Sequence, residues 1–212
     1  MISRPKLLRG LLFCVAQIAA SAAPMEHDLG QDLVFFRLHE LPADLPSVRP
    51  GRTKPCVVDI RYVAAEPAAA SAFCAWIKFR ATVRTPVFVL ANAATSEALL
   101  RTLAELEKGQ GVIVIGAARA QFQPDSGVTI SEEDERKAFN ALEQGTPWAK
   151  LIADHPDKVR NDEASLAKEA LRDPPAEVGL PSRPTPRPSP PIDAALQRAV
   201  HLHRALRAWR RV

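Results

Sequence analysis

Two oppositely charged side chains stand at the end of an apolar run near the middle of the chain. Asp59 and Arg61 are two residues apart, so in a strand they share one face. In α/β proteins, ligand sites gather at the carboxyl ends of parallel strands. A binding cleft at Asp59 and Arg61 is therefore one interpretation. The other, which we favour, is a pair that holds a neighbouring helix.

No pattern for a metal or a cofactor accompanies this pair. His201 and His203 are two residues apart on a predicted helix and point to different sides, unlike the i, i+4 pair that binds zinc. There is no glycine-rich phosphate loop, and nine glycines in 212 residues leave little material for one. We expect neither a metal ion nor a cofactor.

The elements that position Asp59 and Arg61 follow from the hydrophobic period. Helical spacing predicts a helix from Pro67 to about Arg80 and another over about 95–108. Runs of β-branched and aromatic residues predict strands at 33–38, 56–62, 87–92 and 112–116. Alternating strands and helices with short links give right-handed crossovers and parallel pairing. The predicted fold class is α/β, with a mainly parallel sheet and helices covering both faces.

The C-terminal part is predicted to be helical with one proline-rich interruption. A capping box at Ser131, with Asp in place of Glu, predicts a helix that ends at Gly145, and a short helix fits 162–171. Residues 172–191 form a linker, because their prolines permit neither a ladder nor a helix. Residues 192–212 form an amphipathic basic helix. Its predicted apolar stripe is Ile192, Ala195, Ala199, Leu202, Leu206 and Trp209.

The first 22 residues have the pattern of a cleavable signal peptide. Three basic residues precede an apolar run from Leu11 to Ala20, and Ala20-Ser21-Ala22 supplies the small residues that signal peptidase requires. The run has about half of the roughly 20 apolar residues that a membrane-spanning helix needs. We predict cleavage after Ala22, an α/β domain over 23–171, and no transmembrane span after cleavage. The mature chain is expected to be periplasmic or secreted.

Loss of the signal peptide changes the charge balance. The chain has 28 Lys and Arg against 24 Asp and Glu, and residues 1–22 contain three of the basic residues and no acidic one. The mature part therefore has 25 basic and 24 acidic residues, which gives no reason to expect a nucleic acid partner. Cys56 and Cys74 remain, and export would allow a disulfide between them. Two buried free thiols are equally compatible with the sequence.

Three segments resemble the tail-specific, or C-terminal processing, serine peptidases. Residues 57–61 (VVDIR) are similar to the L-V-L-D-L-R strand of that family, and residues 86–98 (PVFVLANAATSEA) to its P-V-V-V-L-V-N-x-x-T-A-S-A-x-E segment. The strand over 112–116 then matches a V-V-G strand in order and spacing. The resemblance covers about 55–120 and implies a crotonase/Clp-like core. Asn92 and Thr95 join Asp59 and Arg61 as candidates for the binding cleft.

The catalytic groups of that family are not all matched. Its serine nucleophile is activated by a lysine. A gapless alignment places Glu97 at the nucleophile position, and Ser96 takes that position only if the turn is one residue shorter. The lysine position holds Phe122, and the nearby Arg119 stays charged and cannot act as a base. Residues 62–66 (YVAAE) lack the glycine turn of the family, and the chain has no room for its PDZ module. Ser96 and Glu97 are the catalytic candidates, in a chain that we expect to be inactive.

Three classes of function follow. The first is an inactive peptidase-like domain that binds a protein or peptide in the cell envelope. The second is a residual serine hydrolase that uses Ser96, and the third is a generic secreted α/β domain whose basic terminal helix contacts an envelope surface or a partner. A Ser96 hydroxyl that faces another helix without a partner would exclude the hydrolase.

Overall fold

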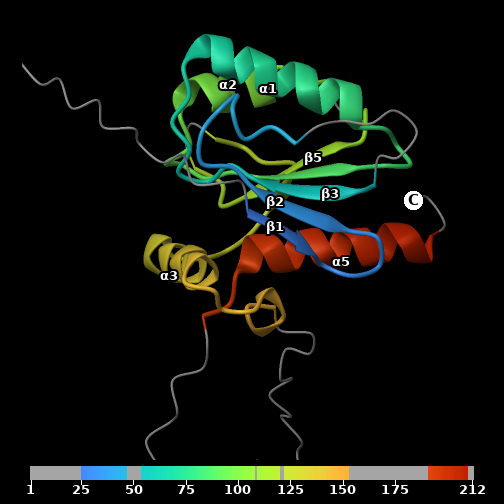
Figure 1. Cartoon of the computed structure of the whole chain (residues 1–212), viewed down its shortest axis with the longest axis vertical. Coiled ribbons are helices and arrows are strands. Elements are labelled where there is room, and N and C mark those ends of the chain that lie inside the picture. Colours follow the sequence, from blue (N-terminus) through green and yellow to red (C-terminus); the bar gives the residue numbers. More distant parts are fainter. Residues whose placement is uncertain (1–24, 47–53, 108, 120–121, 153–190, 210–212) are drawn as a thin grey trace, which may run out of the picture.

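The chain forms one six-stranded sheet with helices on both faces (Figure 1). The computed structural model describes residues 25–46, 54–107, 109–119, 122–152 and 191–209. The strands are β1 (Met25–Asp28), β2 (Val34–Arg37), β3 (Cys56–Asp59), β4 (Val87–Leu90), β5 (Val112–Gly116) and β6 (Ser126–Gly127). The helices are α1 (Pro67–Arg80), α2 (Glu97–Ala104), α3 (Glu132–Glu143) and α5 (Ala194–Ala208), and a 3-10 turn, η1, spans Trp148–Lys150.

The strands lie side by side in the order of the sequence, from β1 to β6. β1 is antiparallel to β2, and every other neighbouring pair is parallel. The predicted α/β class and its mainly parallel sheet are therefore confirmed. β3 and β4 end a few residues earlier than expected, at Asp59 and Leu90. The polar residues that follow these two strands lie together at the carboxyl ends of the strands, because the strands run in the same direction.

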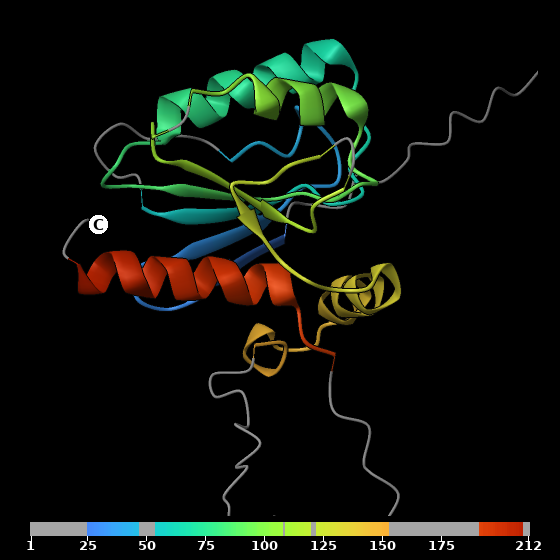
Figure 2. The ribbon, with the colours of Figure 1, turned by 180° about the vertical axis from the view of Figure 1, so that it is seen from behind.

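Each face of the sheet has its own apolar core, because alternate residues of a strand point to opposite faces. Val58 and Val89 belong to the core that includes buried residues of α1 and α2. Val57 and Phe88 belong to the core that includes buried residues of α5. Figures 1 and 2 show α1 and α2 on one face of the sheet and α5 on the other. With both faces covered, the central strands are apolar throughout.

Local sequence signals start three of the helices. Pro67 occupies the first turn of α1, where its missing N–H costs no hydrogen bond. Ser131 caps α3 as expected, its hydroxyl accepting a hydrogen bond from the Asp134 backbone N–H at 3.1 Å. The Asp193 carboxylate caps α5 in the same way and accepts from the Leu196 N–H at 3.0 Å.

Glycine is required at both ends of β5. Gly111 has a φ of +84°, and a Cβ there would lie 2.2 Å from the Thr82 carbonyl oxygen. A Cβ on Gly116 would lie 2.1 Å from the carbonyl oxygen of Ala91. Any larger residue would push β5 away from its neighbours.

The structure corrects the bounds of one helix and adds one strand that was not expected. α2 spans Glu97–Ala104 and not 95–108, because Thr95 forms the turn before the helix and the Glu105 N–H closes its last turn early. β1 was not expected, since its sequence, MEHD, lacks an apolar alternation. It forms because antiparallel pairing to β2 satisfies its backbone groups at one edge of the sheet.

The buried stripe of α5 also differs from the prediction. Ala195 and Ala199 are buried as expected, but Trp209 is 74% exposed and His203 is buried in its place. The helix meets the sheet with its first three turns, so its last residues extend beyond the core. The sequence pattern predicts 192–212 as a helix that the linker separates from the α/β domain. In the structure its described part packs against β4 and β5 and completes the second core.

Several predicted segments lie outside the described residues. They are the signal peptide over 1–22, the short helix over 162–171 and most of the linker over 172–191. In the ranges that are described, no helix is both long enough and apolar enough to cross a membrane.

Candidate functional site

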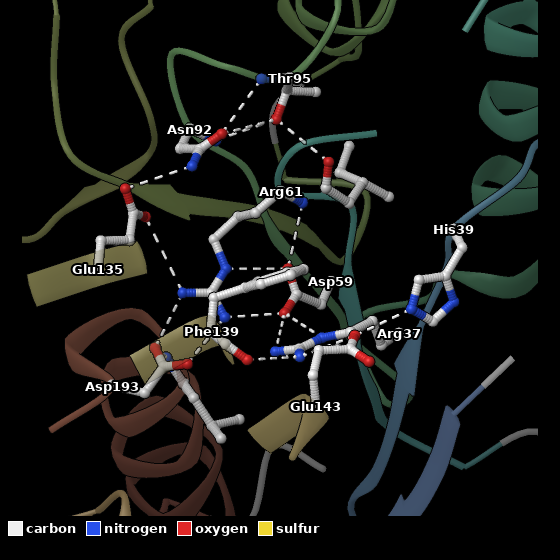
Figure 3. Close-up of polar contacts among 12 residues, drawn as sticks. Arg37, His39, Asp59, Arg61, Asn92, Thr95, Glu135, Phe139, Glu143 and Asp193 are labelled. Carbon is white, nitrogen blue, oxygen red and sulfur yellow. Dashed lines mark hydrogen bonds and ion pairs between the residues drawn. The ribbon is translucent and has the colours of Figure 1, made fainter. Parts of the chain in front are cut away.

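Asp59 is the centre of a buried cluster of charges at the carboxyl end of β3 (Figure 3). Its carboxylate accepts hydrogen bonds from Arg61 Nε and Nη2, at 2.9 and 2.8 Å, and from Arg37 Nε and Nη2, at 3.1 and 2.9 Å. Burial by itself raises the pKa of Asp59, but the charges of Arg61 and Arg37 outweigh it and lower the pKa to about 2. Asp59 is therefore ionised at neutral pH.

Arg61 connects Asp59 to the start of α5. Its Nη1 and Nη2 donate to the two carboxylate oxygens of Asp193, at 3.1 and 2.8 Å. Asp193 also caps α5, so one carboxylate binds both the sheet and the helix. These contacts are those of a pair that holds a neighbouring helix, the interpretation favoured above. We call Arg37, Asp59, Arg61 and Asp193 the ion cluster.

Arg37 joins the ion cluster to α3. Its guanidinium carbon lies 3.8 Å from the centre of the Phe139 ring, and its Nη1 donates to the Phe139 carbonyl at 3.0 Å and to Glu143 at 3.2 Å. His39 Nε2 hydrogen-bonds to the same Glu143 oxygen at 2.9 Å. Burial opposes ionisation of Glu143, but the hydrogen bonds from His39 and Arg37 lower its pKa.

The sequence reasoning missed five members of this site: Arg37, His39, Phe139, Glu143 and Asp193. Arg37 had a visible signal, since it ends the apolar run of β2 as Asp59 ends that of β3. The two residues face each other in the parallel register of these strands, which the sequence alone does not give. Asp193 is 132 residues from Arg61, so no local spacing relates them.

Asn92 and Thr95 shape the turn between β4 and α2. The Asn92 side-chain oxygen accepts from the N–H groups of Ala94 and Thr95, at 3.2 and 3.1 Å. The Thr95 hydroxyl accepts from the Asn92 N–H at 3.1 Å and donates to the Ile60 carbonyl at 3.2 Å. Both side chains are buried. Their hydrogen bonds fix the start of α2 against β3.

Glu135 of α3 is the one carboxylate near Asn92 that is incompletely satisfied. Its Oε2 accepts from Asn92 Nδ2 at 3.3 Å, while its buried Oε1 has no hydrogen-bond partner among the described residues and lies 3.9 Å from Arg61 Nη1. Burial raises the pKa of Glu135 in spite of the positive charge of Arg61. A cavity of about 20 Å³ beside Asn92 and Glu135 has room for one water molecule.

Neither of the two catalytic candidates hydrogen-bonds to a basic partner that could activate Ser96 in the part of the chain that the structure describes. The Ser96 hydroxyl accepts a hydrogen bond from the Ala65 N–H at 3.2 Å, and no lysine, histidine or carboxylate of the described chain hydrogen-bonds to it. Glu97 is exposed and forms an ion pair with Arg101, one turn along α2. Phe122, which the resemblance aligns with the lysine of the peptidase family, is buried in the apolar core. Ser96 therefore faces the segment after β3, and not another helix.

Two amides of that segment are already bonded to protein groups. Tyr62 has a φ of +65°, the left-handed conformation that glycine adopts most easily, and its ring packs edge-on against Phe139. The Val63 N–H donates to the Ile60 carbonyl at 3.2 Å, and the Ala65 N–H donates to Ser96. The turn has a conformation that a glycine would favour, and its Val63 and Ala65 amides are bonded to protein groups.

Hollows lie along α2, and two of them are also lined by Val112 of β5. Three hollows, of about 430, 180 and 360 Å³, follow one another along the helix. Leu100 and Ala104 line both the first and the second, and Leu106, Glu107 and Val112 line both the second and the third. We call the three hollows together the α2 groove. Figure 2 shows α2 and β5 from this side of the molecule.

Comparisons with known proteins give the chain no family. No protein-family model matches it, and no curated protein matches its sequence. Within the described residues, no group of three or more His, Cys, Asp or Glu side chains could hold a metal ion. The class that the fold defines is an α/β domain with a buried ion cluster and a surface groove.

Proposed function

We propose that this chain is an exported relative of the tail-specific serine peptidases that has lost catalysis and binds extended protein or peptide segments in the cell envelope. The observation that carries the proposal is the α2 groove, two of whose hollows are lined by β5, the last long strand of the sheet. Domains that bind extended peptides commonly use such a groove next to a sheet edge. The order β3, α1, β4, α2, β5 is compatible with the crotonase/Clp-like core that the resemblance implies.

The surroundings of Ser96 favour a binding role over the residual hydrolase. A serine attacks at neutral pH only when a neighbouring group takes its proton. Ser96 accepts a hydrogen bond from Ala65, and Phe122 stands where the family has its lysine. The loss of an oxyanion donor alone costs about 3 kcal/mol in transition-state stabilisation. The Val63 amide is already bonded to Ile60 and supplies no such donor.

Loss of catalysis is tested with the protein purified from cells. We expect no cleavage of an unstructured peptide above buffer, measured by mass spectrometry, and no labelling of Ser96 by a fluorophosphonate. The matched control is Ser96→Ala. Cleavage or labelling that this substitution abolishes would make the hydrolase the better proposal.

Binding and export are tested separately. Panning of a random peptide library displayed on phage against the immobilised protein should enrich extended sequences, and a selection without enrichment would contradict the binding role. Mass spectrometry of the protein from envelope fractions should find Ala23 at its N-terminus. An intact Met1 in those fractions would contradict cleavage of the signal peptide.

A further inference from the structure

We infer that the outer edge of β5 binds a peptide segment by strand addition, with a lysine or arginine side chain of that segment in the cavity between β5 and α2. This inference rests on the proposed function and names the chemistry of its ligand. Two observations carry it: the backbone groups at this edge and the charges around the adjacent cavity.

The direction of the backbone groups in β5 follows from its hydrogen bonds to β4. The carbonyls of Gly111 and Ile115 accept from β4 and from the residue that follows it. Because both backbone groups of a residue in a parallel strand point to the same side, Val112 and Val114 direct theirs to the outer edge. The Gly116 carbonyl, which accepts from Val128, points the same way.

Only part of this outer edge is paired in the described chain. β6 pairs with Ile115 and Gly116 and extends no further. Asp125 Oδ2 accepts from the Val114 N–H at 2.9 Å and so takes the place of a strand carbonyl. The parallel pairing of Ile115 with Ser126 also occupies the Val114 carbonyl, which accepts from the Ser126 N–H. The N–H and carbonyl of Val112 have no hydrogen-bond partner among the described residues and are left for one residue of an added strand to pair with.

The cavity beside this edge fits a long side chain with a positive end. It has a volume of about 180 Å³, and its apolar lining includes Leu103, Leu106 and Phe122. The charged residues that line it are Glu107 and Asp125, both acidic and both exposed. A lysine or arginine can bury its apolar stem in such a cavity while its charged end reaches the carboxylates.

The same charges argue against a second copy of this chain as the occupant. Antiparallel pairing of two β5 edges would bring the Glu107 and Asp125 carboxylates of both copies to one interface. Like charges across a strand pair or an interface are destabilising. A peptide with a basic side chain neutralises these charges, whereas a second copy adds to them.

The test measures the fluorescence anisotropy of a labelled peptide, Thr-Val-Lys-Val-Thr, capped at both ends. A second peptide has norleucine in place of lysine, which keeps the stem and removes the charge. The protein variant is Glu107→Gln with Asp125→Asn, since the asparagine oxygen can still accept from the Val114 N–H. Glu105→Gln is the control, because Glu105 is exposed at the end of α2 and outside the hollow that Glu107 lines.

We expect the double variant to bind the lysine peptide about tenfold more weakly than the unmodified protein, as loss of a charged hydrogen bond predicts. Its affinity for the norleucine peptide should stay within about twofold, and Glu105→Gln should change neither affinity. Hydrogen exchange should show protection of the Val112 amide when the lysine peptide binds.

Other outcomes overturn the inference in distinguishable ways. Peptide binding that protects amides away from β5 would overturn it and leave the proposed function intact. Absence of binding by every peptide, panned or synthetic, would overturn both. A dimer in light scattering that the double variant tightens would mean that a second copy occupies this edge.

Discussion

Replacing Asp193 with alanine tests whether the ion cluster holds α5 on the sheet. Asp193 is fully buried, makes two hydrogen bonds to Arg61 and caps α5. The alanine variant removes all three contacts and leaves the Arg61 guanidinium hydrogen-bonded to Asp59, with Glu135 at 3.9 Å from its Nη1. Asn is the matched substitution, because it caps helices about as well as Asp but carries no charge.

The size of the effect follows from the burial of the pair. Removing one partner of a buried ion pair costs about 3–5 kcal/mol. In the alanine variant, Asp59 has to balance the buried charges of both Arg61 and Arg37. Loss of an N-cap costs about 1 kcal/mol. The two terms share one side chain and are not additive, so we expect Asp193→Ala to lower the free energy of unfolding by about 3–5 kcal/mol. Asp193→Asn should lose roughly 2 kcal/mol, since it keeps the cap.

Urea unfolding at pH 7, followed by tryptophan fluorescence and far-ultraviolet circular dichroism, measures this difference. Ser131→Ala is the control, because Ser131 caps α3 at an exposed position without an ion pair to the sheet. It should lose about 1 kcal/mol. If Asp193→Ala costs no more than this control at an unchanged denaturant slope, the ion cluster does not hold α5 and the reasoning fails.

Three further predictions concern titratable groups. The folded-state pKa of Asp59, about 2, lies below its ordinary value of 3.8. The stabilisation from its charge is therefore present above pH 4 and is lost as the pH falls towards 2. Free energies of unfolding from urea titrations at pH 5 and pH 2.5 should differ by about 2 kcal/mol because of this group. The raised pKa of Glu135 means that its ionisation destabilises the folded state as the pH rises above 4.5. Glu135→Gln should therefore raise the urea midpoint at pH 7 but not at pH 4. An equal rise of the midpoint at both pH values would contradict this prediction. Burial raises the pKa of the Cys56 thiol while Cys74 is partly exposed, so mass spectrometry after brief iodoacetamide treatment of native protein should find Cys74 modified before Cys56.

The sequence does not determine whether Cys56 and Cys74 form a disulfide or remain free thiols, and the fold decides between the two. An exported chain allows a disulfide between them, and the spacing does not exclude it. In the structure both thiols are free. Arg80 Nε donates to the Cys56 sulfur at 3.1 Å, from the end of the same helix that contains Cys74.

The central elements could be predicted because their signals are local. The apolar runs of β3, β4 and β5 and the proline at the start of α1 depend only on neighbouring residues, so the pattern of the chain determines them. The same is true of the Ser131 cap. β1 was missed because it has no apolar pattern of its own and pairs through its backbone.

The site depends on contacts between segments far apart in the chain, and these only the tertiary structure decided. Asp59 and Arg61 were recognised by their place at the end of a strand, but their partners were not. Arg37 meets Asp59 through the register of β2 against β3, and Asp193 meets Arg61 through the docking of α5 across 132 positions of sequence. Hydrophobic period determines which segments form strands and helices. Register and docking determine which charges meet, because they depend on how buried faces fit together in space.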